Sequence, residues 1–246
     1  MFKKILALLL ALLLASFAFA ACKEEEPTFV DDPEKPGSSL ENEEASLLKS
    51  GTIGDSALTW EMYGDGVLYI KGTGAMDELE KGEGDSVIQP WYEYCDNQSG
   101  TSITTLVVEG GVTSLASKAF MNCRKLKEVR IASSISIIPE KCFKYCEALT
   151  TVSAKGVVRI EDNAFDSCVK LSTVTFSASL ELVGDGAFLR VGEDAKTFSV
   201  RLAGTLEEWN AAKAAMDADE NDEYDIWTGN EKLIAGLERV AFVNKE

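Results

Sequence analysis

Histidine is absent from the 246 residues of the sequence, and its absence excludes several classes of chemistry. Ser-His-Asp and Cys-His catalysis, zinc sites of the His-Glu-x-x-His type and proton transfer by imidazole all require this side chain. Two carboxylates with pKa values shifted apart could still perform acid–base chemistry, but no sequence feature points to such a pair. The sequence therefore predicts no catalytic residue, no cofactor and no metal centre.

Positive charge is also scarce. The chain has 24 Lys and Arg residues against 41 Asp and Glu residues, which gives a formal charge of −17. Removing residues 1–21 would take away Lys3 and Lys4, so the shortened chain would carry −17 − 2 = −19. Nucleic-acid binding needs a basic footprint, and anionic headgroups attract basic segments. The balance therefore argues against a nucleic-acid partner and against direct adhesion to anionic lipid.

Only one long hydrophobic run is present, at the start of the chain. Lys3 and Lys4 precede an apolar run from Ile5 to Ala20, which ends in small residues directly before a cysteine. The run is slightly shorter than the roughly 20 apolar residues of a membrane-spanning helix, and its layout is that of an export signal over residues 1–21. A permanent membrane helix and an ordinary cleaved signal are the alternatives.

The end of this run carries a further motif. Phe19-Ala20-Ala21-Cys22 resembles the bacterial lipobox, which usually reads Leu-Ala-Gly/Ala-Cys, with Phe19 in place of Leu. The resemblance implies cleavage before Cys22 and diacylation of its sulfur, and two acyl chains give stable anchoring. We therefore expect an extracytoplasmic, membrane-anchored lipoprotein at the cell surface. The sequence leaves open whether an inner or an outer membrane holds the anchor.

Proline is rare, and three of the five prolines fall in residues 23–49. This segment is acidic and shows no sustained hydrophobic period, so it cannot bury enough apolar surface to offset its ordering entropy. It predicts a solvated tether over residues 22–49. Its composition is also compatible with a short helix over Leu40–Lys49.

What the sequence does have is an internal repeat. Phe120, Phe143, Phe165 and Phe188 recur at intervals of 23, 22 and 23 residues. Other apolar columns keep the same register, among them Val112, Ile135, Val157 and Leu180, and also Val129, Val152 and Val174. One unit cannot bury enough surface alone, so successive units must stack around one continuous core. Asp194 and Thr197 break the columns in the fourth unit, and Phe198, Val200 and Leu202 restore the two-residue alternation one residue late, which predicts an insertion near 191–196.

Each unit predicts the same local structure. Leu-x-x-Val-x-Ile ends in a two-residue alternation, which is typical of a short strand, and Val-x-x-Leu/Ile gives a second extended piece. Ala-Phe-x-x-Cys predicts a short helical turn, with Pro139 suited to the start of one of them. Stacked units would place their strands in parallel, about 4.7–4.9 Å apart.

The units resemble those of the BspA-like leucine-rich-repeat family, roughly L-x-x-V-x-I-P-x-x-V-x-x-I-G-x-x-A-F-x-x-C. Residues 112–123 and 157–168 match most closely, and the resemblance covers 103–202. Residues 50–102 look like the family's N-terminal cap, and residues 204–210 are similar to its closing segment. The resemblance implies a leucine-rich-repeat solenoid that recognises or scaffolds other proteins at the cell surface.

The flanks also have a direct physical interpretation. Gly64-Asp65-Gly66 between apolar runs predicts a hairpin. Thr205 and Glu208 predict a capping box, and a helix there could place Leu206, Trp209 and Met216 on one face that covers the open end of the stack. Four aromatic residues of the N-terminal flank either pack the cap, which we favour, or anchor a partner: Trp60, Trp91, Tyr92 and Tyr94.

The remaining five cysteines are Cys95, Cys123, Cys142, Cys146 and Cys168. An odd number cannot pair fully within one chain. Export permits disulfides, and Cys123, Cys146 and Cys168 share one core-facing column at a spacing within reach of a bridge. We favour buried thiols that act as small hydrophobic side chains over a disulfide ladder, and both over zinc, because the spacing matches the repeat rather than a ligand pattern.

Two further features are candidate binding sites, one for calcium and one for a protein partner. The acidic run Asp217–Asp225 begins like an EF-hand loop, but Asp222 stands where Gly is needed and Thr228 where a bidentate Glu belongs. A solvated loop is the favoured interpretation, and calcium is the alternative. The outward strand positions should line one face of the solenoid, which is the candidate binding face: Val107, Arg130, Ser153 and Thr175.

The sequence thus predicts a signal peptide (1–21), a tether (22–49), a β-rich cap (50–102), about four leucine-rich units (103–202) and a mixed α/β closing cap (203–246). The favoured function is a surface-anchored protein-binding or adhesion module with a protein partner of unknown identity. A structural envelope lipoprotein without a dedicated ligand is the first alternative. A carboxylate-based hydrolase is the second, and a cleft with two inward-facing acids would be its mark.

Overall fold

The structure is a computed structural model, and it describes residues 45–84, 86–95, 100–195, 197–218, 230–237 and 240–243. The predicted signal peptide, the predicted lipidation site Cys22 and most of the predicted tether lie outside the described residues. The short helix expected over Leu40–Lys49 is not found where the chain is described, because a strand begins at Leu47.

The described part of the chain has fourteen short strands and three helices. The helices are α2 (Tyr92–Cys95), α3 (Leu206–Ala218) and α4 (Glu231–Leu237). The strands are β1 (Leu47–Thr52), β2 (Leu58–Tyr63), β3 (Val67–Gly72), β4 (Gly74–Ala75), β5 (Thr105–Val108), β6 (Val112–Ser114), β7 (Glu128–Ile131), β8 (Ile137–Ile138), β9 (Thr151–Ser153), β10 (Arg159–Ile160), β11 (Thr173–Ser177), β12 (Leu182–Val183), β13 (Ser199–Ala203) and β14 (Ala241–Val243).

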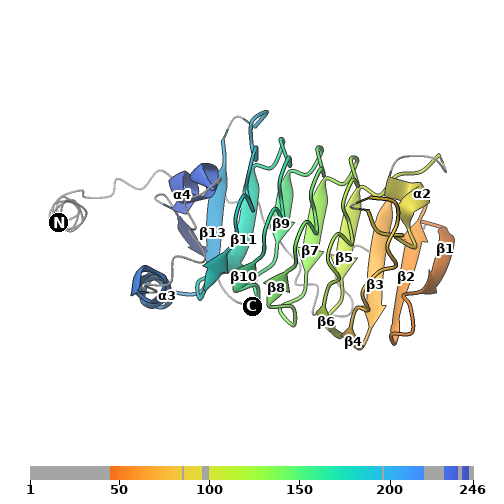
Figure 1. Cartoon of the computed structure of the whole chain (residues 1–246), viewed down its shortest axis with the longest axis horizontal. Coiled ribbons are helices and arrows are strands. Elements are labelled where there is room, and N and C mark those ends of the chain that lie inside the picture. The colour runs from red at the N-terminus through yellow and green to blue at the C-terminus, as the bar shows by residue number, and fades with distance from the viewer. Residues whose placement is uncertain are drawn as a thin grey trace, which may run out of the picture. The chain divides into compact units, whose positions relative to one another are not determined.

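The main sheet has nine strands in the order β1-β2-β3-β5-β7-β9-β11-β13-β14 (Figure 1). From β3 onward every neighbouring pair is parallel, whereas β1-β2 and β2-β3 are antiparallel. This arrangement is a leucine-rich-repeat fold with a hairpin cap at its N-terminal end. The hairpin turns at Gly64–Gly66, and the φ of Gly66 is +89°, a left-handed conformation that favours glycine.

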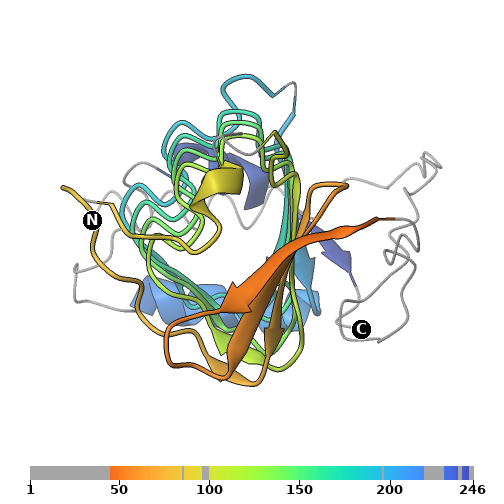
Figure 2. The same cartoon turned by 90° about the vertical axis from the view of Figure 1, so that its right-hand side faces the viewer.

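Successive units wind into stacked coils, which Figure 2 shows almost end on. Val112, Ile135, Val157 and Leu180 are each at most 1% exposed and belong to one continuous apolar core. The second extended piece of three units forms a small parallel sheet, β8-β10-β12, across the core from the main sheet. The stacking inferred from the apolar columns is confirmed.

The Ala-Phe-x-x-Cys segments are not helical turns, and here the prediction was wrong. The residues two before and two after each Phe have positive φ, which a right-handed helix cannot accommodate. They are Lys118, Asn122, Lys141, Tyr145, Asn163, Ser167, Gly186 and Arg190. Pro139 precedes such a turn and starts no helix.

In these segments alternate N–H groups have different acceptors. Those of Ala119, Met121 and Cys123 bond three residues back within the coil, while those of Lys118, Phe120 and Asn122 bond to carbonyls of the next coil. Equivalent bonds join the later coils, and the nine inter-coil bonds are 2.8–3.0 Å long. We call the stacked segments 117–123, 140–146, 162–168 and 185–191 the turn ladder. It satisfies backbone groups that a helix would have satisfied internally.

The phenylalanine column forms a continuous stack beneath the turn ladder. Trp91 stacks on Phe120 with ring centroids 5.1 Å apart, and the Phe120–Phe143, Phe143–Phe165 and Phe165–Phe188 distances are 5.5, 5.4 and 5.3 Å. Phe198 ends the stack edge-on at 6.3 Å. The spacing of the rings follows the spacing of the coils, because each coil contributes one ring.

The N-terminal cap continues the stack with side chains. The indole N–H of Trp91 donates to the carbonyl of Ala119 (3.1 Å), and the Gln89 amide donates to the carbonyls of Lys118 and Met121 (2.9 and 3.1 Å). In the inner coils the carbonyls equivalent to those of Ala119 and Met121 accept backbone N–H groups from the preceding coil. The cap therefore takes the place of a missing coil.

The C-terminal cap uses the same device. The fully buried Asn230 accepts from the N–H of Phe188 (2.9 Å) and donates to the carbonyl of Gly184 (3.0 Å). The equivalent N–H of Phe165 donates to a carbonyl of the next coil. Gly236 of α4 lies so close to Val200 of β13 that a Cβ would be 2.5 Å from its Cγ2.

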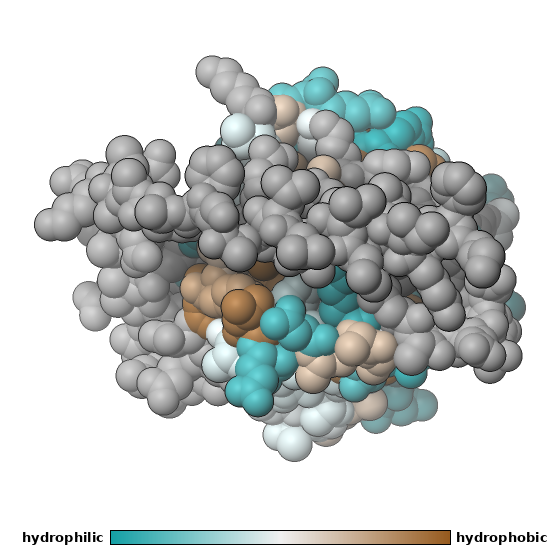
Figure 3. Space-filling model, turned by 90° about the vertical axis from the view of Figure 1, so that its left-hand side faces the viewer, coloured by the Kyte–Doolittle hydropathy of each residue, from teal (hydrophilic) through white to brown (hydrophobic). Residues whose placement is uncertain are grey.

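Helix α3 begins with the predicted capping box. The N–H of Thr205 donates to Glu208 Oε2 (2.8 Å), and the N–H of Glu208 donates to Thr205 Oγ1 (3.2 Å). Trp209 is buried, but Leu206 is 58% exposed, so the expected shared apolar face fails at Leu206. Figure 3 views this end of the stack, where apolar side chains lie at the surface among hydrophilic ones.

Candidate functional site

The four predicted face residues lie in one row across the main sheet. Val107 pairs with Arg130, Arg130 with Ser153, and Ser153 with Thr175. The row continues to Tyr69 of β3 on one side and to Arg201 of β13 on the other. Since alternate strand residues point to opposite faces and the neighbours of these residues fill the core, the whole row belongs to the outward face.

Exposure differs along this row. Val107 and Thr175 are only 5% and 9% exposed, so they contribute little side-chain surface. Arg130 and Ser153 are half-buried. Arg130 donates to Glu128 Oε1 of its own strand at 2.7 Å, in a partly buried ion pair. A partner on this face would meet a shallow polar surface rather than a groove.

A network of charged and aromatic side chains occupies the N-terminal third of the face. The Lys71 ammonium lies 3.0 Å from the Glu61 carboxylate and 3.7 Å from that of Glu109. It also stands 4.8 Å from the centre of the Tyr69 ring, which packs edge-on against Tyr63 at 5.6 Å. The Tyr63 hydroxyl donates to Glu61 at 2.9 Å. These cross-strand pairs tie β2, β3 and the residue after β5 together.

The same contacts shift the pKa values of the network. Partial burial alone would raise the pKa of Glu61, but hydrogen bonds from Lys71 and Tyr63 outweigh it and lower the pKa. Burial would likewise lower the pKa of Lys71, but Glu61 and Glu109 raise it. The hydrogen bond to Glu61 raises the pKa of Tyr63. Each group is thus held in its ordinary ionisation state near neutral pH, which suits a structural network better than proton transfer.

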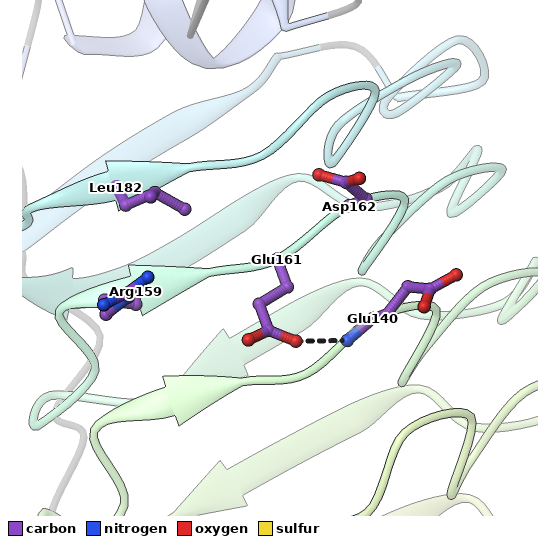
Figure 4. Close-up of a pocket in the computed structure, with 5 residues that line it drawn as sticks. All are labelled: Glu140, Arg159, Glu161, Asp162 and Leu182. Atoms are coloured by element: carbon purple, nitrogen blue, oxygen red, sulfur yellow. Dashed lines mark hydrogen bonds between the residues drawn. The ribbon is translucent and has the colours of Figure 1, made fainter. Parts of the chain in front are cut away.

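A shallow pocket of about 150 Å³ opens on the opposite side, near β10 and β12 (Figure 4). It is lined by Glu140, Arg159, Glu161, Asp162 and Leu182. Glu161 accepts from the N–H of Glu140 at 3.0 Å, and Asp162 accepts from the N–H of Asp185 at 2.9 Å. These two acids therefore bond to backbone groups of neighbouring coils. Such roles hold the coils in register.

The cysteines follow the prediction only in part. Cys95 and Cys123 form a disulfide, so the expectation of a thiol at Cys123 was wrong. Cys146 and Cys168 are buried thiols, as expected, and so is Cys142. Cys146 and Cys168 donate to the carbonyls of the phenylalanines one coil earlier, each at 3.2 Å. Cys123 heads the column, where the preceding coil is replaced by α2 with Cys95.

Burial determines the reactivity of the three thiols. Because no water solvates a thiolate in the core, burial raises their pKa values far above that of a free cysteine. A disulfide in turn fits an extracytoplasmic location, because the cytosol keeps thiols reduced.

Of the cap aromatics, Trp60, Trp91 and Tyr94 are buried and pack the cap, whereas Tyr92 is 50% exposed. Asp217 lies in the last turn of α3, and the rest of the acidic run Asp217–Asp225, except for the backbone of Ala218, lies outside the described residues. Among the residues that are described, no group of three or more His, Cys, Asp or Glu side chains is placed to hold a metal. No helix in that part of the chain has the length and apolarity to cross a membrane.

Comparison with known proteins gives the family of the repeats. Residues 94–200 match the BspA type leucine rich repeat region in six copies. These residues are therefore similar to the repeats of that family. No curated protein matches the sequence.

Three solved structures are similar. A leucine-rich repeat protein from Eubacterium ventriosum is 20% identical over 63% of this chain and 45% of its own, with a TM-score of 0.44. A leucine-rich repeat protein from Bacteroides ovatus is 20% identical over 41% of this chain and 32% of its own, with a TM-score of 0.36. A leucine rich cell surface protein from Faecalibacterium prausnitzii is 22% identical over 63% of this chain and 40% of its own, with a TM-score of 0.42. The chain spans less than half the length of each of them.

Proposed function

We propose that this chain is a lipid-anchored, cell-surface binding module that presents the outward face of the main sheet to a protein partner. The row from Tyr69 through Arg130 to Arg201 carries the proposal, because it is continuous over six paired strands. Solenoids use such extended surfaces for binding. The anchor at Cys22, the export signal and the adhesion role belong to the same proposal.

Three observations support a surface location and a binding role over catalysis. The Cys95–Cys123 disulfide fits an oxidising compartment. The sequence has no histidine. The acids of the shallow pocket bond to backbone N–H groups instead of facing one another across a cleft.

The test compares capture by two variants. The full chain, immobilised through its C-terminus, is exposed to host and bacterial surface extracts. Ser153→Arg places a long cation in the middle of the face, and Ile137→Arg places one on the exposed outer side of β8. We expect a captured protein to be lost with Ser153→Arg and kept with Ile137→Arg. Equal capture by both variants would refute the face, and no capture by the unmodified chain would favour a structural envelope lipoprotein.

A further inference from the structure

The middle of the outward face offers little that could anchor a partner. Val107 and Thr175 are only 5% and 9% exposed, and Ser153 is small. Arg130 is already paired with Glu128 at 2.7 Å. Hot spots of protein interfaces are enriched in tyrosine, tryptophan and arginine side chains, and the tyrosines of this face lie in the N-terminal hairpin, on β2 and β3 (Figure 1).

Four side chains of this hairpin form what we call the tyrosine patch: Leu47, Glu61, Tyr63 and Tyr69. In the strand pairing Leu47 lies opposite Tyr63, and Glu61 lies opposite Tyr69. Paired residues share one face of a sheet. Leu47 is 51% exposed, and both tyrosines are half-buried. The patch therefore brings an aliphatic side chain, two aromatic rings and a carboxylate together at the surface.

The ring of Tyr63 is held in one position by its neighbours. It packs edge-on against Tyr69 with ring centroids 5.6 Å apart, and its hydroxyl donates to Glu61 at 2.9 Å. A side chain that is already fixed loses little conformational entropy on binding, so more of its contact energy appears as affinity. Tyr63 is therefore preorganised to receive a partner.

The charges at this end of the face favour a cation. The hairpin and the residue after β5 contribute three carboxylates, those of Glu61, Asp65 and Glu109, and one ammonium, that of Lys71. Lys49 of β1 is engaged with Glu93 of α2. The next cations along the sheet belong to β7 and the residue before it, three strands from β2. A cationic side chain would therefore complement the patch.

One contact between a cation and a tyrosine already exists on this face. The ammonium of Lys71 stands 4.8 Å from the centre of the Tyr69 ring and 3.0 Å from the Glu61 carboxylate. Within the described part of the chain, no cation stands over the ring of Tyr63, although Glu61 is bonded to its hydroxyl and the exposed Asp65 follows two residues later. Tyr63 thus offers a second combination of ring and carboxylate, which a cation from outside can occupy.

We infer that the tyrosine patch is the centre of the binding face and takes a protein segment that presents a Lys or Arg side chain beside an aliphatic one. The cation stacks on Tyr63 next to Glu61, and the aliphatic side chain packs on Leu47. This rests on the proposed function, because it names the part of the same face that holds the partner and the chemistry of that partner. An exposed contact between a cation and an aromatic ring changes affinity by about two- to fivefold, and a hot-spot tyrosine by about thirtyfold or more.

The probe is a library of short random peptides displayed on phage and selected on the full chain, immobilised through its C-terminus. We expect the selected peptides to be enriched in Lys or Arg beside Leu, Ile, Val or Met. The affinity of a selected peptide, made synthetically, should fall about tenfold or more with Tyr63→Ala and change little with Tyr63→Phe, which keeps the ring. Because Tyr63→Ala also removes the bond to Glu61, the exposed Leu47→Ser is the second variant and should weaken binding without affecting the fold.

Two controls separate the patch from general attraction. A chain with a formal charge of −17 attracts cationic peptides without specificity. Tyr92→Ala removes a tyrosine that is 50% exposed on α2, outside the sheet, and should leave the affinity unchanged. Replacing the Lys or Arg of the peptide by Gln should weaken binding to the unmodified chain and add little further loss with Tyr63→Ala, because both changes remove the same contact.

The outcomes distinguish the patch from the face as a whole. Equal affinity for the Tyr63→Ala and Tyr92→Ala variants would overturn the patch. If that affinity were nonetheless lost with Ser153→Arg, the outward face of the proposed function would stand and only its centre would be misplaced. Selected peptides without enrichment in Lys or Arg would overturn the chemistry assigned to the partner. Binding that neither Tyr63→Ala nor Ser153→Arg alters would count against both the patch and the face.

Discussion

Single side chains complete the hydrogen bonding of the stack at its two ends. Gln89 and Trp91 supply donors to the first coil, and Asn230 supplies both an acceptor and a donor to the last. A carboxamide presents the same C=O and N–H groups as a peptide unit, so one side chain can replace the edge of an absent coil. Each coil end would otherwise hold buried backbone groups without partners.

Asn230→Ala should therefore be among the more damaging polar substitutions in the protein. It leaves the N–H of Phe188 and the carbonyl of Gly184 buried without their present partner, and each such group costs about 1–3 kcal/mol. We expect a loss of about 2–5 kcal/mol in the free energy of unfolding, measured by urea titration.

Asn210→Ala is the matched control, because Asn210 lies exposed on α3 and a surface change away from special features stays within about 0.5 kcal/mol. If the two variants unfolded at the same urea concentration, the view that Asn230 closes the stack would be wrong.

At the scale of elements, the strands could be predicted from the sequence and the turns could not. Apolar columns at a fixed period define which residues face the core, and β5, β7, β9 and β11 all fall on them. Strand β13 lies later than the period places it, because Val174 pairs with Val200 and Thr197 occupies the column. The Ala-Phe-x-x-Cys segments have the spacing of a helical face, but the spacing does not reveal that Lys118 and Asn122 take positive φ. That conformation is stabilised by hydrogen bonds to carbonyls of the next coil. The sequence of a single repeat does not reveal these acceptors.

The aromatic stack is the element that most directly joins the coils. Phe143 lies at its centre, has no exposed surface, and packs between Phe120 and Phe165. Phe143→Ala should lower the free energy of unfolding by about 3–5 kcal/mol, since a buried phenylalanine leaves a large cavity.

Denaturant unfolding of Phe143→Ala should be compared with that of Leu189→Ala, whose side chain is 41% exposed and whose loss should cost far less. Similar losses in both variants would contradict the role of the stack. A broad transition for Phe143→Ala alone would show that the coils on its two sides had begun to unfold separately.

For the whole molecule, the solenoid could be predicted because the repeat is present in the sequence, whereas the caps follow no period. The interval from Trp91 to Phe120 is 29 residues and that from Cys95 to Cys123 is 28, longer than the repeat. Trp91-x-x-x-Cys95 nonetheless resembles Phe-x-x-Cys with a larger ring and one extra residue, and this was the available signal for the disulfide. Asn230 gave no such signal, because an isolated polar residue in an acidic segment has no pattern.

The oxidation state of the whole chain gives a quantitative prediction. Burial raises the pKa values of Cys142, Cys146 and Cys168, so the folded protein should be unreactive toward a thiol reagent at pH 8. After denaturation without reductant, these residues should supply three thiols per chain, and Cys22 should supply none if its sulfur is acylated.

A titre of four in the denatured, unreduced chain would show that Cys22 is free, and a titre of five or more would show that Cys95 and Cys123 are reduced. Rapid reaction of the native protein would contradict the packing of the thiols. The same sample treated with reductant provides the control, since opening the disulfide should add two thiols to the titre.

The turn ladder has one further consequence. Because each coil bonds only to its two neighbours through the same backbone groups, an added or deleted unit of 22 or 23 residues would present unchanged surfaces to both caps. Duplication of one repeat unit could therefore lengthen the solenoid without any change in the two caps. Each added unit would extend the outward face of the main sheet by one strand spacing, about 4.8 Å.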